Sequence, residues 1–120
     1  MIFFMRKVLE DLIFIGEVKE TYTVCGKQWV LKTLTSEEQL TATASTRDYD
    51  NISRVNALKR AYLARSIIEV NNIPLRDINE KIEFLGTLQQ PIIDLLYDKY
   101  LDVQKKQDEE LKDFDEDLKN

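Results

Sequence analysis

Few side chains in this 120-residue sequence could carry catalysis. The chain has no histidine and a single cysteine, Cys25. Histidine is the side chain that most readily exchanges protons at neutral pH, and it is also the commonest metal ligand. A cysteine nucleophile normally needs such a base beside it, and one cysteine can form neither an intramolecular disulfide nor a cysteine metal cluster. These absences argue against thiol, proton-shuttle and zinc chemistry.

Acidic pairs are the remaining residues that could do acid–base or metal chemistry. They occur at Glu37-Glu38 and at residues 108–110. Paired carboxylates can share the work of a general acid and a general base, but adjacent acids on helices more often keep a protein in solution. The acids lack the spacing of a calcium-binding loop, and the three glycines stand too far apart to form a phosphate-binding loop. We therefore expect no enzyme activity, no cofactor and no bound metal.

The overall charge also limits the choice of partners. The net charge is −5 and the isoelectric point is near 4.8, so a nucleic acid is an unlikely ligand. The alternative is a local basic patch on one predicted helix, formed by Arg54, Lys59, Arg60 and Arg65. The simpler interpretation is that these four residues form an ordinary solvent-exposed helix face with no ligand.

The apolar start of the chain, residues 1–5, is too short to span a membrane. Its basic residues follow the apolar run, whereas a signal peptide carries them in front. The sequence therefore predicts a soluble, unprocessed protein of the cytoplasm, and the lack of a cysteine pair fits that compartment.

The elements that must position any binding residues begin with an apolar segment and a hairpin. Residues 2–15 place apolar side chains at helical spacing, although a strand is an alternative after Asp11: Phe4, Val8, Leu9, Leu12 and Ile15. Residues 18–34 contain two alternating, β-rich stretches around a turn at 25–27, which predicts a β-hairpin. Trp29 is its largest side chain, suited to the core or to a partner.

Helices fill the rest of the predicted fold. Thr35 and Glu38 form a capping-box pattern that opens a short helix to about Ala44. A second helix is expected from residue 46 to about Val70, with its cap at residues 45–48. Its apolar stripe comprises Ile52, Val55, Leu58 or Lys59, Tyr62, Leu63, Ile67 and Val70.

The sequence Asn-Asn-Ile-Pro at residues 71–74 should end this helix. A shorter helix should then start at Asp77 and close at Gly86. Thr87 with Gln90 is expected to open the last helix.

The last helix has the most regular apolar pattern of the chain. Its heptad-like seam is Ile92, Leu96, Tyr100, Val103, Gln107, Leu111, Phe114 and Leu118. Before Val103 the apolar face is wider, whereas residues 105–119 carry four lysines and seven acids, a net charge of 4 − 7 = −3. We therefore predict a mainly α, α+β fold with a single α-rich domain at residues 1–103. Residues 104–120 would form a charged helical extension.

Residues 18 to about 107 resemble a known group of proteins in the order of their motifs. Residues 26–35 are similar to the segment of these proteins in which a hairpin leads into a helix. That segment begins with Gly-Lys and ends with Leu-x-x-Leu-Thr. Residues 56–75 contain a Leu-Ala-Arg-x-Ile helix leading into an Asn-containing turn, and residues 91–100 resemble the final helix. This order looks like that of tail assembly chaperones and baseplate-hub assembly proteins of tailed bacteriophages. The acidic tail and the apolar N-terminal segment depart from the pattern.

The resemblance implies a protein that acts by binding other proteins and has no active site. The implied partner is a tape-measure, baseplate or hub protein, or a second copy through the last helix, in the host cytoplasm. A structural component of the virion is an alternative, and a small regulatory or nucleic-acid-binding module is another. The candidate contact residues are Trp29, Tyr62, Tyr97, Tyr100, Leu111, Phe114 and Leu118. For the first four, core packing is at least as strong an expectation as contact with a partner, whereas docking is favoured for the last three.

Overall fold

The computed structural model describes residues 15–119, with side chains up to residue 116. Four helices and one four-stranded antiparallel sheet of order β1-β2-β3-β4 make up this part of the chain. The elements are β1 (Lys19–Val24), β2 (Lys27–Lys32), α2 (Ser36–Ala44), α3 (Asn51–Ser66), β3 (Ile67–Val70), β4 (Ile73–Pro74), α4 (Ile78–Gly86) and α5 (Gln90–Lys119). The predicted α+β class with a long C-terminal helix is confirmed. The choice between helix and strand for residues 2–14 lies outside the described residues.

The first hairpin is confirmed at the predicted place. Val24 pairs with Lys27 across the turn, where Cys25 (φ 53°) and Gly26 (φ 76°) both have positive φ. Such a left-handed two-residue turn matches the natural twist of two antiparallel strands. The indole Nε1 of Trp29 donates a hydrogen bond to Val24 O (3.1 Å), which fixes the ring inside the hairpin.

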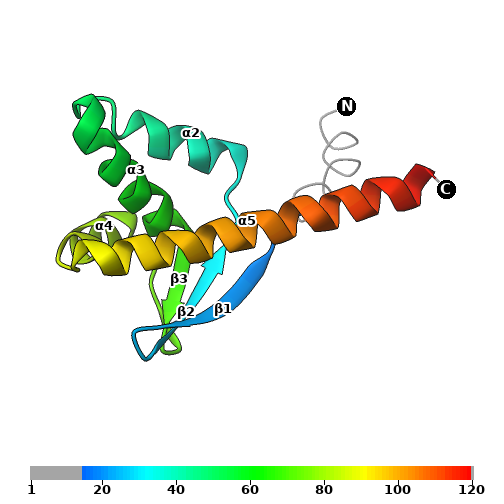
Figure 1. Ribbon diagram of the computed structural model, residues 1–120, viewed down its shortest axis with the longest axis horizontal. Coiled ribbons are helices and arrows are strands. Elements are labelled where there is room, and N and C mark those ends of the chain that lie inside the picture. The colour runs from blue at the N-terminus through cyan, green and yellow to red at the C-terminus, as the bar shows by residue number, and fades with distance from the viewer. Residues whose placement is uncertain (1–14, 120) are drawn as a thin grey trace, which may run out of the picture.

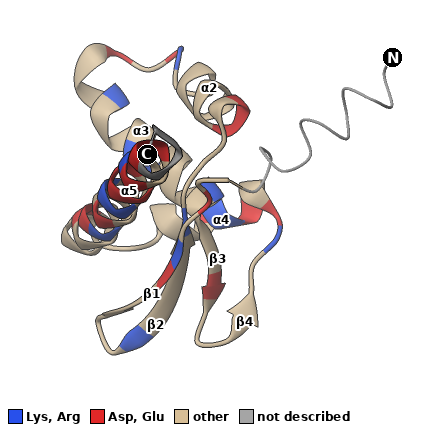
Figure 2. Cartoon of the chain, turned by 90° about the vertical axis from the view of Figure 1, so that its right-hand side faces the viewer, with Lys and Arg blue, Asp and Glu red and all other residues tan. Residues whose placement is uncertain are grey.

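A second hairpin replaces the end of the predicted long helix. The helix was expected to reach Val70, and this is wrong, because α3 ends at Ser66 and the next four residues form β3. Asn71 and Asn72 have positive φ (50° and 66°) and turn the chain into β4. The free edge of β2 decides the outcome, since it offers backbone hydrogen bonds to β-branched residues that suit a strand. Figure 2 shows the two hairpins side by side.

The start of α3 also differs from the prediction. The helix begins at Asn51, after an N-cap at Asp50 whose carboxylate accepts from Ser53 N (2.7 Å). Ile52 and Val55 were expected in the core stripe, but they are 88% and 57% exposed. The buried residues of α3 all lie in its C-terminal half, from Ala61 to Ser66, so Ile52 and Val55 lie outside the core.

Of the three other predicted caps, two follow the sequence and one does not. Thr35 and Glu38 make the predicted capping box of α2. The Asp77 carboxylate accepts from Glu80 N (3.0 Å) at the start of α4. Thr87 does not cap α5 as expected, because its hydroxyl donates to Phe84 O (2.6 Å) and closes the end of α4.

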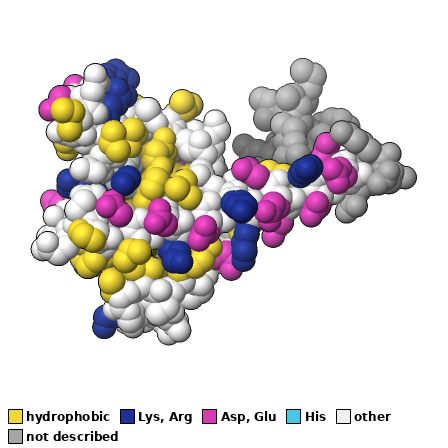
Figure 3. Space-filling view, in the orientation of Figure 1, with side chains coloured by type: hydrophobic (Ala, Val, Ile, Leu, Met, Phe, Trp, Pro, Cys, Tyr) yellow, Lys and Arg dark blue, Asp and Glu magenta, His cyan; other side chains and the backbone are white. Residues whose placement is uncertain are grey.

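The core lies where α5 crosses the sheet and meets α3 (Figure 1). Its fully buried members come from β2, α3, β3, α4 and α5, and include Leu31, Leu63, Ile67, Leu85, Ile93, Leu96, Tyr100 and Val103. The C-terminal part of α5 extends beyond the sheet, where basic and acidic side chains alternate along its surface (Figure 3).

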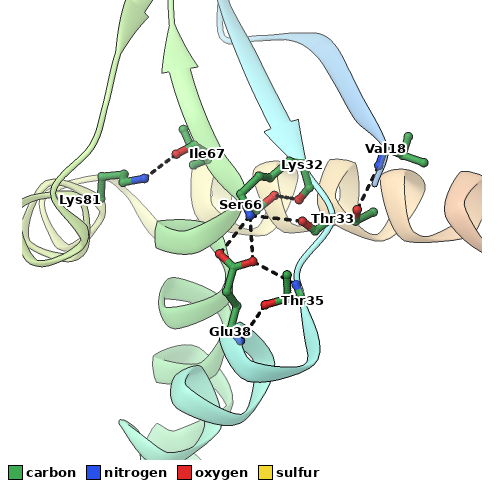
Figure 4. Close-up of polar contacts among 8 residues, drawn as sticks. All are labelled: Val18, Lys32, Thr33, Thr35, Glu38, Ser66, Ile67 and Lys81. Carbon is green, nitrogen blue, oxygen red and sulfur yellow. Dashed lines mark hydrogen bonds and ion pairs between the residues drawn. The ribbon is translucent and has the colours of Figure 1, made fainter. Parts of the chain in front are cut away.

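A polar junction fastens the helices to the end of β2 (Figure 4). The Lys32 ammonium contacts both Glu38 carboxylate oxygens at 2.9 Å, and Ser66 Oγ donates to Lys32 O (2.7 Å). Thr33 Oγ1 accepts from Val18 N (3.1 Å). These bonds satisfy polar groups at the point where α2, α3 and two strands meet.

Candidate functional site

An apolar groove of about 670 Å³ opens between the two hairpins and the helices α4 and α5. We call it the hairpin groove, and its apolar walls are Trp29, Val70, Ile73, Pro74, Leu75, Phe84, Leu88 and Ile92. Its volume lies within the range of about 300–1,000 Å³ that is common for binding cavities.

Strand pairing and helix packing bring the walls together. Trp29 of β2 stands opposite Val70 of β3, and the turn at Asn71 then returns the chain so that Ile73 pairs with Val70. From the other side, the Phe84 ring lies 6.5 Å from the Trp29 ring, centroid to centroid. Ile73 is 64% exposed and Phe84 is 43% exposed, so both are accessible to a partner.

Charges of both signs border the groove and give it no net preference for an anion or a cation. Lys27 and Arg76 are basic, and Asp77 and Glu80 are acidic. Lys81 is different, because it is only 7% exposed and its ammonium donates to Ile67 O (2.8 Å). Burial lowers the pKa of this ammonium. Its hydrogen bond holds α4 against the start of β3, which supports one wall of the groove.

Three of the predicted contact residues, Tyr62, Tyr97 and Tyr100, form one aromatic cluster between α3 and α5. Tyr62 and Tyr100 are stacked with centroids 6.0 Å apart, and Tyr97 lies 5.7 Å from Tyr100. Tyr100 is 2% exposed, and its burial strongly raises the pKa of its phenol. Tyr100 is therefore a core residue and not a contact for a partner. Tyr62 and Tyr97 are half-buried against it.

Trp29 is also buried, at 4% exposure, which agrees with the core alternative considered for it. It nevertheless forms the floor of the hairpin groove. The sequence reasoning missed Val70, Ile73 and Phe84 as its companions. The Asn71-Asn72 pair was the available signal, since asparagine tolerates positive φ and is typical of tight hairpin turns.

The last three predicted residues lie on the projecting part of α5. Leu111 is 38% exposed and Phe114 is 46% exposed, whereas the side chain of Leu118 falls outside the described residues. The helix continues through residue 104 without a break. Beyond that point Lys106 still forms an ion pair with Glu20 (2.9 Å).

The four basic residues considered for nucleic acid do not form a free patch. The guanidinium of Arg65 is buried and donates to Ala61 O (2.9 Å). Lys59 forms an ion pair with Asp94 (2.9 Å), and Arg60 lies against Gly86. Arg54 is partly exposed. The four side chains therefore do not lie together on one exposed surface, because Arg65 is buried.

No family model matches the chain, and neither the curated proteins nor the solved structures contain a match. Over residues 15–119, no helix is long and apolar enough to cross a membrane. The same part of the chain contains no group of three or more acidic or cysteine side chains placed to hold a metal ion. The hairpin groove is therefore the site on which a functional proposal can be built.

Proposed function

We propose that this protein is an assembly factor that binds an apolar segment of a partner protein in the hairpin groove. The groove itself carries the proposal, because an apolar hollow with an exposed isoleucine and phenylalanine at its edge is costly to leave in water. The sequence resemblance makes a phage tape-measure, baseplate or hub protein the partner to test. The binding would take place in the host cytoplasm.

The apolar lining of the groove suits an amphipathic helix as the bound segment. A helix presents side chains at three- and four-residue spacing, which can enter one hollow together. Addition of a partner strand to β4 is less favourable, because this edge strand has only two residues and Pro74 has no N–H to donate. The net negative charge of the chain would keep it in solution while the groove is empty.

Co-expression with candidate tape-measure, baseplate and hub proteins tests the proposal. Ile73→Asp should weaken capture of the partner at least about tenfold, because a carboxylate would lose its water inside an apolar interface. Ile52→Asp is the matched control, since Ile52 is even more exposed and does not line the groove. Equal capture by both variants, or capture by neither the native chain nor the control, would refute the proposal.

Mass spectrometry of purified phage particles distinguishes an assembly factor from a structural component of the virion. A transient assembly factor should be absent from them, whereas a tail or baseplate component should be present in fixed ratio to the tail proteins. Circular dichroism of both variants checks that the fold is retained.

A further inference from the structure

The strand β1 forms one edge of the sheet, and no described strand pairs with its outer side (Figure 1). The strand at the other edge, β4, has only two residues and includes Pro74. By contrast, β1 has six residues, no proline and an uninterrupted register with β2. An edge of this kind presents a row of free N–H and C=O groups that can pair with a further strand.

The pairing with β2 determines which residues of β1 point their backbone groups outward. Just before β1, the carbonyl of Val18 accepts from Thr33 N (3.0 Å), so the even-numbered residues face β2. Gln28, the partner of Thr23, directs its N–H and C=O to Asn71 on the other side of β2. The direction of these groups alternates along a strand. The free edge therefore carries the backbone groups of the odd-numbered residues, which are all exposed: Lys19, Thr21 and Thr23.

These outward groups fit one register between two antiparallel copies of β1. When the pairing is centred on Thr21, that residue pairs with itself and Lys19 pairs with Thr23, so all three odd-numbered residues of each copy are used. A shift of two residues toward the N-terminus would place Glu20 opposite Glu20, and like charges directly opposite are destabilising. A shift toward the C-terminus would place Lys19 opposite Cys25, whose positive φ belongs to the turn.

The side chains suit the register centred on Thr21. Two threonines meet on the axis, and threonine pairs are among the favourable cross-strand pairs. On the face that carries α5, Glu20 lies opposite Tyr22 of the second copy. The Tyr22 hydroxyl is buried and has no hydrogen-bond partner among the described residues. Burial raises the pKa of this phenol, so it stays protonated and can donate. The ion pair of Glu20 with Lys106 uses Oε1, which leaves Oε2 as an acceptor.

We propose that the protein forms a two-fold symmetric dimer in which β1 pairs with β1 of a second copy, so that the two sheets become one. A two-fold axis requires a patch that is complementary to itself, and the register centred on Thr21 meets that requirement. The interface is small, so the dimer should form in a concentration-dependent way. It uses none of the apolar walls of the hairpin groove, and the inference does not depend on the function proposed for that groove.

Disulfide trapping in the full-length chain tests this register. Cys25 is exposed and is first replaced by serine. Thr21→Cys places two thiols on the two-fold axis, where the Cα atoms of a hydrogen-bonded pair lie about 5.5 Å apart. This separation is within the range of about 4.4–6.8 Å that a disulfide needs. Lys19→Cys and Thr23→Cys are the matched controls, since each cysteine would lie about 14 Å from its counterpart in the second copy.

Thr21→Cys should form disulfide-linked dimers at least about tenfold faster than either control alone, as followed by non-reducing electrophoresis. An equimolar mixture of Lys19→Cys and Thr23→Cys should also cross-link, because these two positions face each other across the antiparallel pair. Equal reaction at all three positions would indicate parallel or random contact between the copies. That result, or no cross-link either in Thr21→Cys or in the mixture, overturns the proposal.

Analytical ultracentrifugation covers the case in which the cysteine geometry fails. The native chain should shift from monomer to dimer as its concentration rises. Thr21→Pro should weaken the dimer at least about tenfold, because it removes an outward N–H on the axis, whereas Thr21→Val keeps that N–H and should leave the dimer unchanged. Proline is tolerated where an edge N–H faces solvent, and circular dichroism checks the fold. A native chain that stays monomeric, or a dimer that survives Thr21→Pro, would also reject the pairing.

Discussion

Asn71 is the residue through which the second hairpin can be tested most sharply. Its backbone has φ 50°, in the left-handed region. Its side-chain Oδ1 accepts from Gln28 N, and its own N–H donates to Gln28 O, both at 2.8 Å. The residue thus closes β3 and joins it to β2 beside the wall of the hairpin groove.

Three substitutions separate the contribution of the positive φ of Asn71 from that of its side-chain hydrogen bond. Asn71→Ala loses a side-chain hydrogen bond worth about 0.5–1.5 kcal/mol and places a Cβ in the left-handed region at about 1 kcal/mol, so we expect a loss of about 2 kcal/mol. Asn71→Gly removes the strain and loses the acceptor, at about 1 kcal/mol. Asn71→Asp keeps both the acceptor and the tolerance of positive φ, so its stability should stay within about 0.5 kcal/mol of the native value.

Urea unfolding followed by tryptophan fluorescence measures these changes directly. Trp29 is the only tryptophan, is 4% exposed and lies on β2, next to the strand that Asn71 closes. Equal losses for the alanine and glycine variants would show that positive φ contributes nothing. An aspartate variant as unstable as the alanine variant would show that the acceptor is unused. If all three remain within about 0.5 kcal/mol of the native protein, the left-handed turn at this position is refuted.

Further predictions concern the core and two ionisable groups. Leu63→Ala should lower the free energy of unfolding by about 2–5 kcal/mol, because Leu63 is fully buried. Leu40→Ala, at 69% exposure, should change it by less than about 0.5 kcal/mol in the same urea titration. Burial acts to raise the pKa of Glu38, but the capping hydrogen bond and Lys32 outweigh it and hold the pKa below its usual 4.5. Its stabilising contribution should therefore be complete above pH 4.5 and be lost as the pH falls through the folded-state pKa, and Glu38→Gln should lose less stability over that range. Burial lowers the pKa of Lys81 below 10.5, so the unfolded chain holds this proton more tightly than the folded one. Stability should accordingly rise between the folded-state pKa and pH 10.5, and thermal unfolding of Lys81→Met should lack that rise.

Features encoded within a few residues were predictable from the sequence. The turn at Cys25-Gly26, the capping box from Thr35 to Glu38 and the cap at Asp77 all appear where the sequence put them. Each depends on a side chain or backbone preference that acts over three or four positions. No distant part of the chain is needed to decide them.

Features decided by distant pairing were predicted wrongly. Residues 67–70 continue the apolar pattern of α3, and on local grounds they extend the helix. They form β3 because the edge of β2, more than thirty residues earlier, offers a hydrogen-bonding partner. The exposure of Ile52 likewise depends on how the helices and the sheet pack together. The local sequence pattern around Ile52 does not predict that packing.

The sequence by itself therefore determined the α+β class, the first hairpin, the long last helix and the absence of histidine and of a cysteine pair. Only the tertiary structure decided that Trp29, Val70, Ile73 and Phe84, from four different elements, share one groove. It also decided that Tyr100 is core, while Leu111 lies beside Gly16. The physical reason is that helical and turn preferences act between near neighbours, whereas an apolar surface is made when remote segments exclude water from one another.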